Sequence, residues 1–159
     1  HFEHEVLLAY DADGVNRGKV LVDGLGFVRA HEDIAAAATV LQADGGVGVV
    51  GYCWGGTAAY LANTRLSLPA VSYYGARTVP FLAEQTQAPM LFHFGEHDAS
   101  ISARDIEAHR EHQEHAEIHV YPAGHGFNCD QRPDFERQSA TLALERTLAF
   151  FRRALHPAY

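Results

Sequence analysis

The sequence predicts a three-layer α/β fold, in which helices cover both faces of a mostly parallel sheet. Short apolar segments alternate along the chain with helical patterns, which is typical of parallel strands joined by crossover helices. Clusters of turn residues separate these segments. We find no internal repeat, linker or low-complexity tract, so residues 1–159 are expected to form one domain.

The first 26 residues are the hardest to interpret. Val6–Tyr10 fits a short strand or a buried turn, and Asp11–Gly14 has the composition of a loop. From Phe27 to Gln42 the apolar residues recur at helical spacing, and Asp44–Gly46 ends this helix.

The remaining elements follow the same alternation of strand and helix. In chain order we expect a strand at Val47–Val50, a helix at Gly55–Leu66, a strand at Ala70–Tyr74, a short helix or loop at Pro80–Gln87, a strand at Met90–Phe94, a polar helix at 103–115, a strand at Ile118–Tyr121, a loop at Pro122–Cys129 and an amphipathic helix at Asp134–Leu155.

Composition limits the possible functions. The chain has 12 basic and 20 acidic residues and a net charge of −8, so nucleic acids and anionic membranes are not expected partners. No apolar run approaches the ~20 residues needed to span a bilayer, and the first residues are not a signal peptide. Two cysteines, Cys53 and Cys129, do not make a disulfide framework. A reducing, cytoplasmic location is therefore expected.

Residues 47–59, VGVVGYCWGGTAA, contain the feature around which the fold is organised. The apolar residues Val47–Val50 predict a strand buried on both faces, and small residues after the turn begin a helix. Cys53 then occupies the sharp turn of a nucleophile elbow, where serine is more familiar. Gly51 and Gly55 are expected to be required, because side chains there would collide with the neighbouring strand or helix.

The position of Cys53 favours reactivity. Unsatisfied N–H groups and the helix dipole stabilise a thiolate at a helix N-terminus. The backbone N–H of Trp54 is then placed to donate to an oxyanion on an acyl group attacked by Cys53. The alternative is that Cys53 is an ordinary small buried residue, as free cysteines usually are.

Two further side chains follow predicted strands, Asp98 in the loop after Met90–Phe94 and His125 in the loop after Ile118–Tyr121. Carboxyl ends of parallel strands meet at one edge of the sheet, so these loops should meet that of Cys53. His125 could take the thiol proton, and Asp98 could orient and stabilise the imidazole. Alternatively, Asp98 is a turn residue, and the glycines beside His125 reflect a flexible loop.

The sequence resembles the dienelactone hydrolase (carboxymethylenebutenolidase) family of the α/β-hydrolase superfamily. The matching stretches are VGVVGYCWGG, VSYYGA, FHFGEHD, VYPAGHGFNCD and ERTLAFF, within residues 17–152. The resemblance implies that a cyclic enol-lactone, of the dienelactone type, is opened to a dicarboxylic keto acid of the maleylacetate type. It implies a Cys53–His125–Asp98 triad, a thioester on Cys53, and neither a metal nor an organic cofactor.

The chain departs from the family at its N-terminus, because it lacks the N-terminal strands of family members. Those strands supply a second oxyanion-hole N–H, a glutamate that controls the cysteine's ionisation and an arginine that holds the substrate carboxylate. The chain is either a fragment or a protein in which another segment or subunit supplies them. The uncovered side could also associate, giving a monomer or a homo-oligomer.

Weaker candidates complete the set. Tyr74 and Phe127 could wall a substrate pocket or simply pack beside the loops. Cys129 is expected to be a bystander thiol. His109, His112 and His115 recur at a spacing that permits metal binding in pairs, but interleaved glutamates favour a charged solvent-facing surface.

Three functions therefore remain open. The favoured function is a cysteine-dependent lactone hydrolase, and the alternatives are a general esterase or thioesterase of the same fold and a catalytically weak domain that acts by association. Substrate choice depends on pocket shape, which these motifs do not determine.

Overall fold

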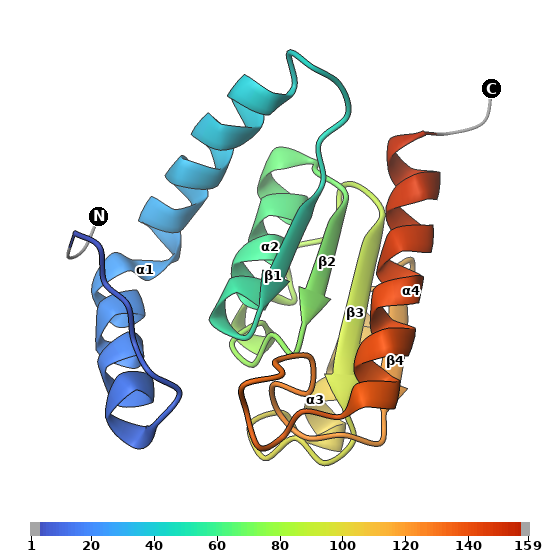
Figure 1. Cartoon of the computed structure of the whole chain (residues 1–159). Helices are drawn as coiled ribbons and strands as arrows, with labels where there is room; N and C mark the ends of the chain where they lie inside the picture. Colours follow the sequence, from blue (N-terminus) through green and yellow to red (C-terminus); the bar gives the residue numbers. More distant parts are fainter. Residues whose placement is uncertain (1–3, 157–159) are drawn as a thin grey trace.

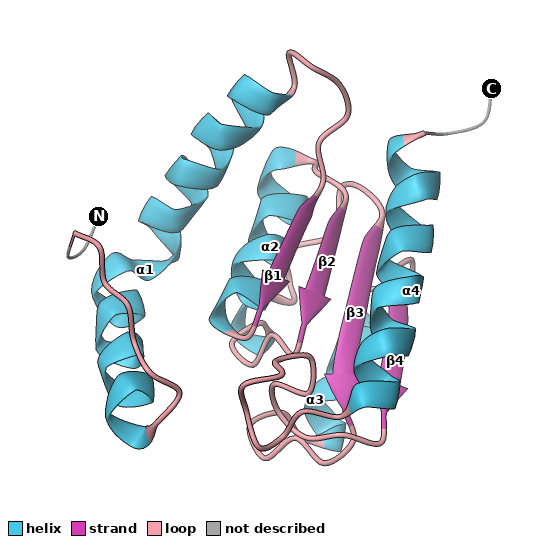
Figure 2. Ribbon diagram, in the orientation of Figure 1, coloured by secondary structure: helices cyan, strands magenta, loops and turns pink. Residues whose placement is uncertain are grey.

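The computed structural model describes residues 4–156 and contains a four-stranded sheet in the order β1-β2-β3-β4, with every pair of neighbours parallel (Figures 1 and 2). The elements are α1 (Ala12–Leu41), β1 (Val49–Tyr52), α2 (Trp54–Leu66), β2 (Ala70–Tyr73), a 3-10 turn η1 (Val79–Phe81), β3 (Met90–Gly95), α3 (Ala103–His112), β4 (Glu117–Tyr121) and α4 (Arg137–Leu155).

Alternate residues of β3 show that helices cover both faces of the sheet. Phe92 packs against Tyr60 of α2, and Phe94 packs against His109 of α3. His93 points to the opposite face, where its Nε2 lies 3.0 Å from Thr147 Oγ1 of α4. The expectation of a three-layer fold with a parallel sheet is therefore confirmed, and Figure 1 shows α2 and α4 on opposite sides of the strands.

The first strand differs from its prediction in extent and burial. It begins at Val49 rather than Val47, and it is not buried on both faces, since Val50 and Tyr52 are each 45% exposed. The reason is its place at the sheet edge. Val50 and Tyr52 point to the α4 face, but α4 packs over β3 and leaves β1 uncovered.

The largest correction concerns the secondary structure predicted for the N-terminal residues. Val6–Tyr10 is neither a strand nor a buried turn, because it is irregular and Leu7 is 96% exposed. Asp11 is not in a loop but caps α1, and its Oδ1 accepts the backbone N–H of Gly14 at 2.7 Å. The helix thus begins 15 residues before the predicted Phe27.

Helix α1 is broken at Gly26, which adopts φ 69° and ψ 165° between two helical arms. This conformation is open to glycine and strained for other residues. The buried residues of the helix, Ala30 and Ala38, both lie after the break. The sequence predicts only the second arm, because Gly14, Gly18 and Gly24 make the first arm resemble a loop.

Smaller corrections concern helix ends. α4 begins at Arg137 rather than Asp134, because the carboxylate of Glu136 caps it by accepting N–H groups of Gln138 and Ser139. α3 ends at His112 rather than residue 115. None of the helices formed by residues 4–156 is long and apolar enough to cross a membrane.

Candidate active site

Cys53 lies in the sharp turn between β1 and α2 and adopts a strained backbone conformation with a positive φ, at φ 53° and ψ −118°. Such strain is typical of a nucleophile elbow. The strand pairing with β2 and the packing of α2 hold the turn, and Cys53 N–H donates to the carbonyl of Tyr73 at 2.9 Å. The thiol is left exposed at the end of the sheet.

Of the two glycines predicted to be required around this turn, the structure requires only one. A Cβ at Gly51 would lie 1.9 Å from the carbonyl oxygen of Gly55, so Gly51 is required. A Cβ at Gly55 would meet nothing within 4 Å, so that part of the prediction is wrong. The second constrained glycine is Gly56, where a Cβ would lie 2.7 Å from the carbonyl oxygen of Tyr73.

The structure brings Cys53, His125 and Asp98 into one hydrogen-bonded chain. His125 Nε2 lies 3.2 Å from Cys53 Sγ, and His125 Nδ1 lies 2.7 Å from Asp98 Oδ2. The Asp98 side chain is fully buried, whereas that of His125 is 16% exposed. A carboxylate on one ring nitrogen and a thiol on the other is the arrangement that transfers a proton between sulfur and imidazole.

The surroundings of Cys53 favour the thiolate. Burial alone would raise the pKa of the thiol, but four effects outweigh it: the hydrogen bond from His125, the charge of His125, the N–H of Trp54 and the charge of Arg132. Together they hold the pKa of Cys53 below its ordinary value. The N–H of Trp54, at the first position of α2, is thus one of the groups that stabilise a negative charge on the sulfur.

The imidazole of His125 is correspondingly basic. Burial lowers its pKa, but the hydrogen bonds and charges of Asp98 and Cys53 raise it to about 9. A thiol whose pKa is lowered, beside an imidazole whose pKa is raised, favours transfer of the proton from sulfur to the ring nitrogen.

Trp54 also anchors the region through its indole ring. The ring stacks on Phe27, with centroids 4.6 Å apart and planes inclined by 8°. Phe27 is the first residue after the break in α1, and it contacts Phe81 edge-on as well. The second arm of α1 is therefore fixed directly beside the turn that carries Cys53.

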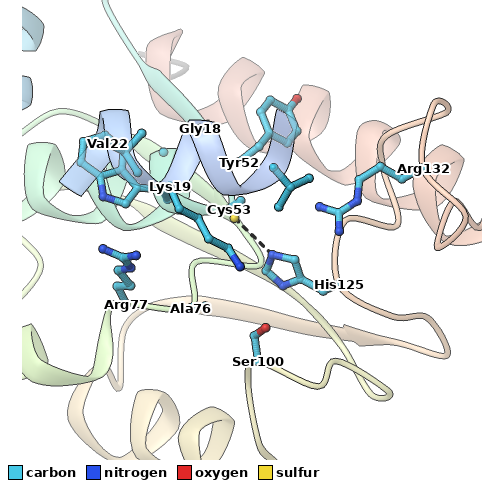
Figure 3. A pocket seen from close by; sticks show the side chains of 13 residues that line it. Gly18, Lys19, Val22, Tyr52, Cys53, Ala76, Arg77, Ser100, His125 and Arg132 are labelled. Atoms are coloured by element: carbon cyan, nitrogen blue, oxygen red, sulfur yellow. Dashed lines mark hydrogen bonds between the residues drawn. The ribbon is translucent and has the colours of Figure 1, made fainter. Parts of the chain in front are cut away.

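A cavity of about 650 Å³ opens above Cys53 and His125 (Figure 3). One wall is the first arm of α1, which contributes Val15, Lys19 and Val22. Tyr74 and Phe127 are not among the lining residues and are 3% and 0% exposed, so the prediction that they wall the pocket is wrong. Instead, Tyr74 packs behind the catalytic candidate His125, with ring centroids 5.2 Å apart.

Three cationic residues that the motifs did not single out line the cavity, namely Lys19, Arg77 and Arg132. Arg132 packs on the residue after His125, since a Cβ at Gly126 would lie 3.1 Å from Arg132 Cδ and Nη1. Arg132 follows His125 by seven residues in the same loop, which is the signal that could have found it. Lys19 lies within residues 1–26, where the sequence predicts no helix.

Cys129 does not line the cavity; it lies near the hydroxyl of Tyr10 and helps to raise the pKa of that group. His109 does not belong to a solvent-facing surface, because it is 1% exposed and its Nδ1 bonds to the Asp105 carbonyl. Within residues 4–156 no group of three or more His, Cys, Asp or Glu side chains is arranged to hold a metal ion.

Comparison with known proteins identifies relatives of this chain. A carboxymethylenebutenolidase of Pseudomonas sp. (strain P51) is 34% identical over 146 residues, which cover 88% of this chain and 60% of the relative. The crystal structure of a proposed dienelactone hydrolase from Klebsiella pneumoniae superposes with a TM-score of 0.76 at 30% identity, covering 84% of this chain and 64% of that one. An esterase of Pyrococcus furiosus shares the fold, with a TM-score of 0.58 at 13% identity over 77% of this chain and 60% of the esterase.

The parallel sheet and the strand–turn–helix that carries Cys53 define a protein of the α/β-hydrolase fold. The model of the dienelactone hydrolase family matches residues 18–155, and this chain belongs to that family. It spans 60% and 47% of the length of two carboxymethylenebutenolidases that it matches.

Proposed function

We propose that this protein hydrolyses a cyclic enol-lactone, of the dienelactone type, through a thioester on Cys53. The observation that carries the proposal is the continuous chain Asp98–His125–Cys53, in which the sulfur faces the cavity and its pKa is lowered. Membership of the dienelactone hydrolase family supports the substrate class.

In the first step the thiolate of Cys53 attacks the lactone carbonyl carbon. A C–S bond forms, and the carbonyl π electrons move to oxygen, which becomes an oxyanion. The N–H of Trp54 lies beside the sulfur and is positioned to donate to this oxygen. In the thiolate–imidazolium form of the pair, no proton has to move before this attack.

In the second step the tetrahedral intermediate collapses and the ring C–O bond breaks. The ring oxygen leaves as an enolate, which is a better leaving group than a simple alkoxide. The His125 imidazolium donates its Nε2 proton to this enolate, which becomes a ketone after tautomerisation. Asp98 keeps its bond to Nδ1 throughout and holds the ring in place.

In the third step water hydrolyses the thioester. Neutral His125 takes a proton from water, the hydroxide oxygen attacks the acyl carbon, and the C–S bond breaks to release the thiolate. The product carboxylic acid then ionises. Cys53 and His125 return to the thiolate–imidazolium pair, so the net reaction is lactone plus water to an open-chain keto acid.

The chemistry of this reaction also fixes the charge of the substrate. Opening a lactone creates one carboxylate, whereas the proposed product is a dicarboxylic keto acid. The dienelactone itself therefore already carries one carboxylate. The three cations that line the cavity suit such an anion.

Replacement of Cys53 by alanine tests the proposal. Dienelactone turnover, followed by loss of its ultraviolet absorbance, should fall by at least about a thousandfold in Cys53→Ala. The matched control is Cys129→Ala, which removes the other thiol, away from the cavity lining, and should retain turnover. Equal turnover in Cys53→Ala and wild type would exclude a cysteine mechanism.

A second measurement separates lactone hydrolysis from general ester hydrolysis. The same preparation is assayed with dienelactone and with 4-nitrophenyl pentanoate under identical conditions. A higher kcat/KM for the lactone supports the proposal, and a higher value for the aryl ester supports a general esterase. A protein that turns over neither substrate and forms oligomers would instead act by association.

A further inference from the structure

The first arm of α1, residues 12–25, forms a wall of the active-site cavity but is only loosely joined to the rest of the protein. None of its residues is buried, in contrast to Ala30 and Ala38 in the second arm. Few buried contacts and an exposed backbone are the features of a segment that opens at low free-energy cost. The arm is therefore the part of the cavity wall that is most able to move.

Gly26 is placed to act as a hinge for this movement. It breaks the helix with φ 69° and ψ 165°, and a Cβ there would meet nothing within 4 Å. Glycine is therefore required by backbone conformation and not by space. The next residue, Phe27, is fixed by its stack on Trp54, so any rotation at Gly26 moves the first arm and not the second.

An ion pair holds the arm in its present position. Asp23 Oδ1, near the hinge, lies 2.5 Å from Arg77 Nη1, which belongs to the loop after β2. The two side chains are 56% and 47% exposed. An exposed pair of this kind is weak and can open and close.

Lys19 is carried by the same arm and lines the cavity together with Cys53 and His125. Figure 3 shows its side chain extending from the arm into the pocket. It is the only lysine of the sequence, and the other 11 basic residues are arginines. Among the described residues it has no ion pair, and no Asp or Glu is among the residues that line the cavity.

We propose that residues 12–25 are a hinged lid, and that Lys19 closes it by binding an anionic group of the substrate. An amine with no carboxylate partner in a cavity of three cations attracts an anion, although the chain as a whole has a net charge of −8. This inference rests on the proposed function, because the substrate carboxylate is the anion expected there. Closure would also exclude bulk water from the acylation step.

Lys19 makes the lid directly measurable, because a lysine-specific protease has a single internal site in this chain. Cleavage after a helical residue requires local unfolding, so its rate reports opening of the arm. In Cys53→Ala protein, which needs no turnover, glutarate should slow cleavage about threefold or more, and its neutral diamide, glutaramide, should not. Equal protection by both compounds, or by neither, would overturn binding of an anion by the arm.

The ion pair is tested in the same assay. Asp23→Asn should accelerate cleavage about threefold, since a weak exposed pair contributes little more than this. Glu32→Gln, which removes an exposed negative charge from the second arm, is the matched control and should leave the rate unchanged. Unchanged cleavage in Asp23→Asn would show that this pair does not hold the lid.

Specificity for charge is tested with two esters of similar length, mono-4-nitrophenyl glutarate and neutral 4-nitrophenyl pentanoate. In Lys19→Gln, kcat/KM for the anionic ester divided by kcat/KM for the neutral ester should fall about tenfold. Lys19→Arg should restore most of the ratio. Arg17→Gln removes a cation from the same arm, outside the cavity lining, and should keep the wild-type ratio; an equal loss in Arg17→Gln would contradict a specific role of Lys19.

Two glycine substitutions, one at the hinge and one in the regular helix, test the role of Gly26. Gly26→Ala should lower the same ratio, because alanine disfavours φ 69° and turns Lys19 away from the cavity. Gly24→Ala lies in the regular helix, where a Cβ meets nothing, and should keep the ratio. Identical behaviour of the two variants would refute the hinge. Absence of dienelactone turnover in wild type would refute the proposed function, while the proteolysis result would still decide whether the lid exists.

Discussion

Gly51 faces the carbonyl oxygen of Gly55 so closely that a Cβ on Gly51 would lie 1.9 Å from it. The contact joins the end of β1 to the first turn of α2, and Cys53 lies between them. No side-chain adjustment can relieve this clash, because both groups involved are backbone. The strained turn of the nucleophile candidate is therefore possible only with glycine at position 51.

Replacement of these two glycines should have opposite outcomes. Gly51→Ala should lower the free energy of unfolding by about 3 kcal/mol or more, because the strand and helix must separate. Gly55→Ala fills open space inside a helix and should change it by less than about 1 kcal/mol, in the stabilising direction. Urea denaturation of the two variants measures both effects, and similar destabilisation in both would contradict the geometry of the turn.

The order of strands and helices could be predicted from the sequence because each strand is a short apolar run followed by a turn. The strands β2 and β3 were placed to within one residue. The N-terminal arm of α1 could not be predicted in this way. None of its residues is fully buried, its glycines Gly14, Gly18 and Gly24 are typical of a loop, and its capping residue Asp11 resembles an ordinary loop residue.

The same distinction applies to the candidate site. Cys53, Asp98 and His125 were found because each follows its own strand, and the topology of a parallel sheet brings such positions together. Lys19 and Arg132 reach the cavity through the path of a helix arm and a long loop. Those paths depend on tertiary packing, which local sequence patterns do not encode.

Arg132 is expected to contribute to the reactivity of the thiol. Its positive charge is one of the effects that lower the pKa of Cys53, so Arg132→Gln should raise that pKa. The rate of alkylation by iodoacetamide, measured against pH in a Cys129→Ala background, should then have its midpoint at higher pH. Arg137→Gln, which removes a charge outside the cavity lining, is the control and should leave the midpoint in place; equal midpoints for all three proteins would refute this role.

His93 predicts how stability depends on pH. Its side chain is fully buried between Tyr121 and Thr147, and burial, followed by the charges of His119 and Arg146, lowers its pKa to about 3. The unfolded chain binds a proton at His93 near pH 6.5, whereas the folded chain does not until about pH 3. The contribution of His93 to stability is therefore largest above pH 6.5 and falls as pH decreases through this window, by up to about 1.4 kcal/mol per pH unit.

Urea denaturation between pH 7 and pH 4 measures this slope. In His93→Asn the slope should decrease by about one proton's contribution, whatever the stability of the variant at pH 7. His97→Asn, at an exposed position in a loop, should keep the wild-type slope. A wild-type slope in His93→Asn would show that His93 is protonated in the folded protein.

The stack between Phe27 and Trp54 should contribute measurably to stability. Phe27→Ala removes this stack and the edge contact with Phe81, and should lower the free energy of unfolding by about 2 kcal/mol. Val28→Ala removes a neighbouring side chain that is 70% exposed, and it should have an effect below about 0.5 kcal/mol. A similar effect of the two substitutions would mean that the second arm of α1 is not anchored at Trp54.

The most direct measurement of the central claim is the mass of the protein during turnover. The reaction with dienelactone is stopped with acid within its first turnovers, and the peptide that contains Cys53 is analysed by mass spectrometry. Ring opening releases no leaving group, so the account predicts that this peptide gains the full mass of one lactone and loses it after the substrate is exhausted. Turnover with no adduct on Cys53, or with an adduct on Cys129 alone, would contradict it.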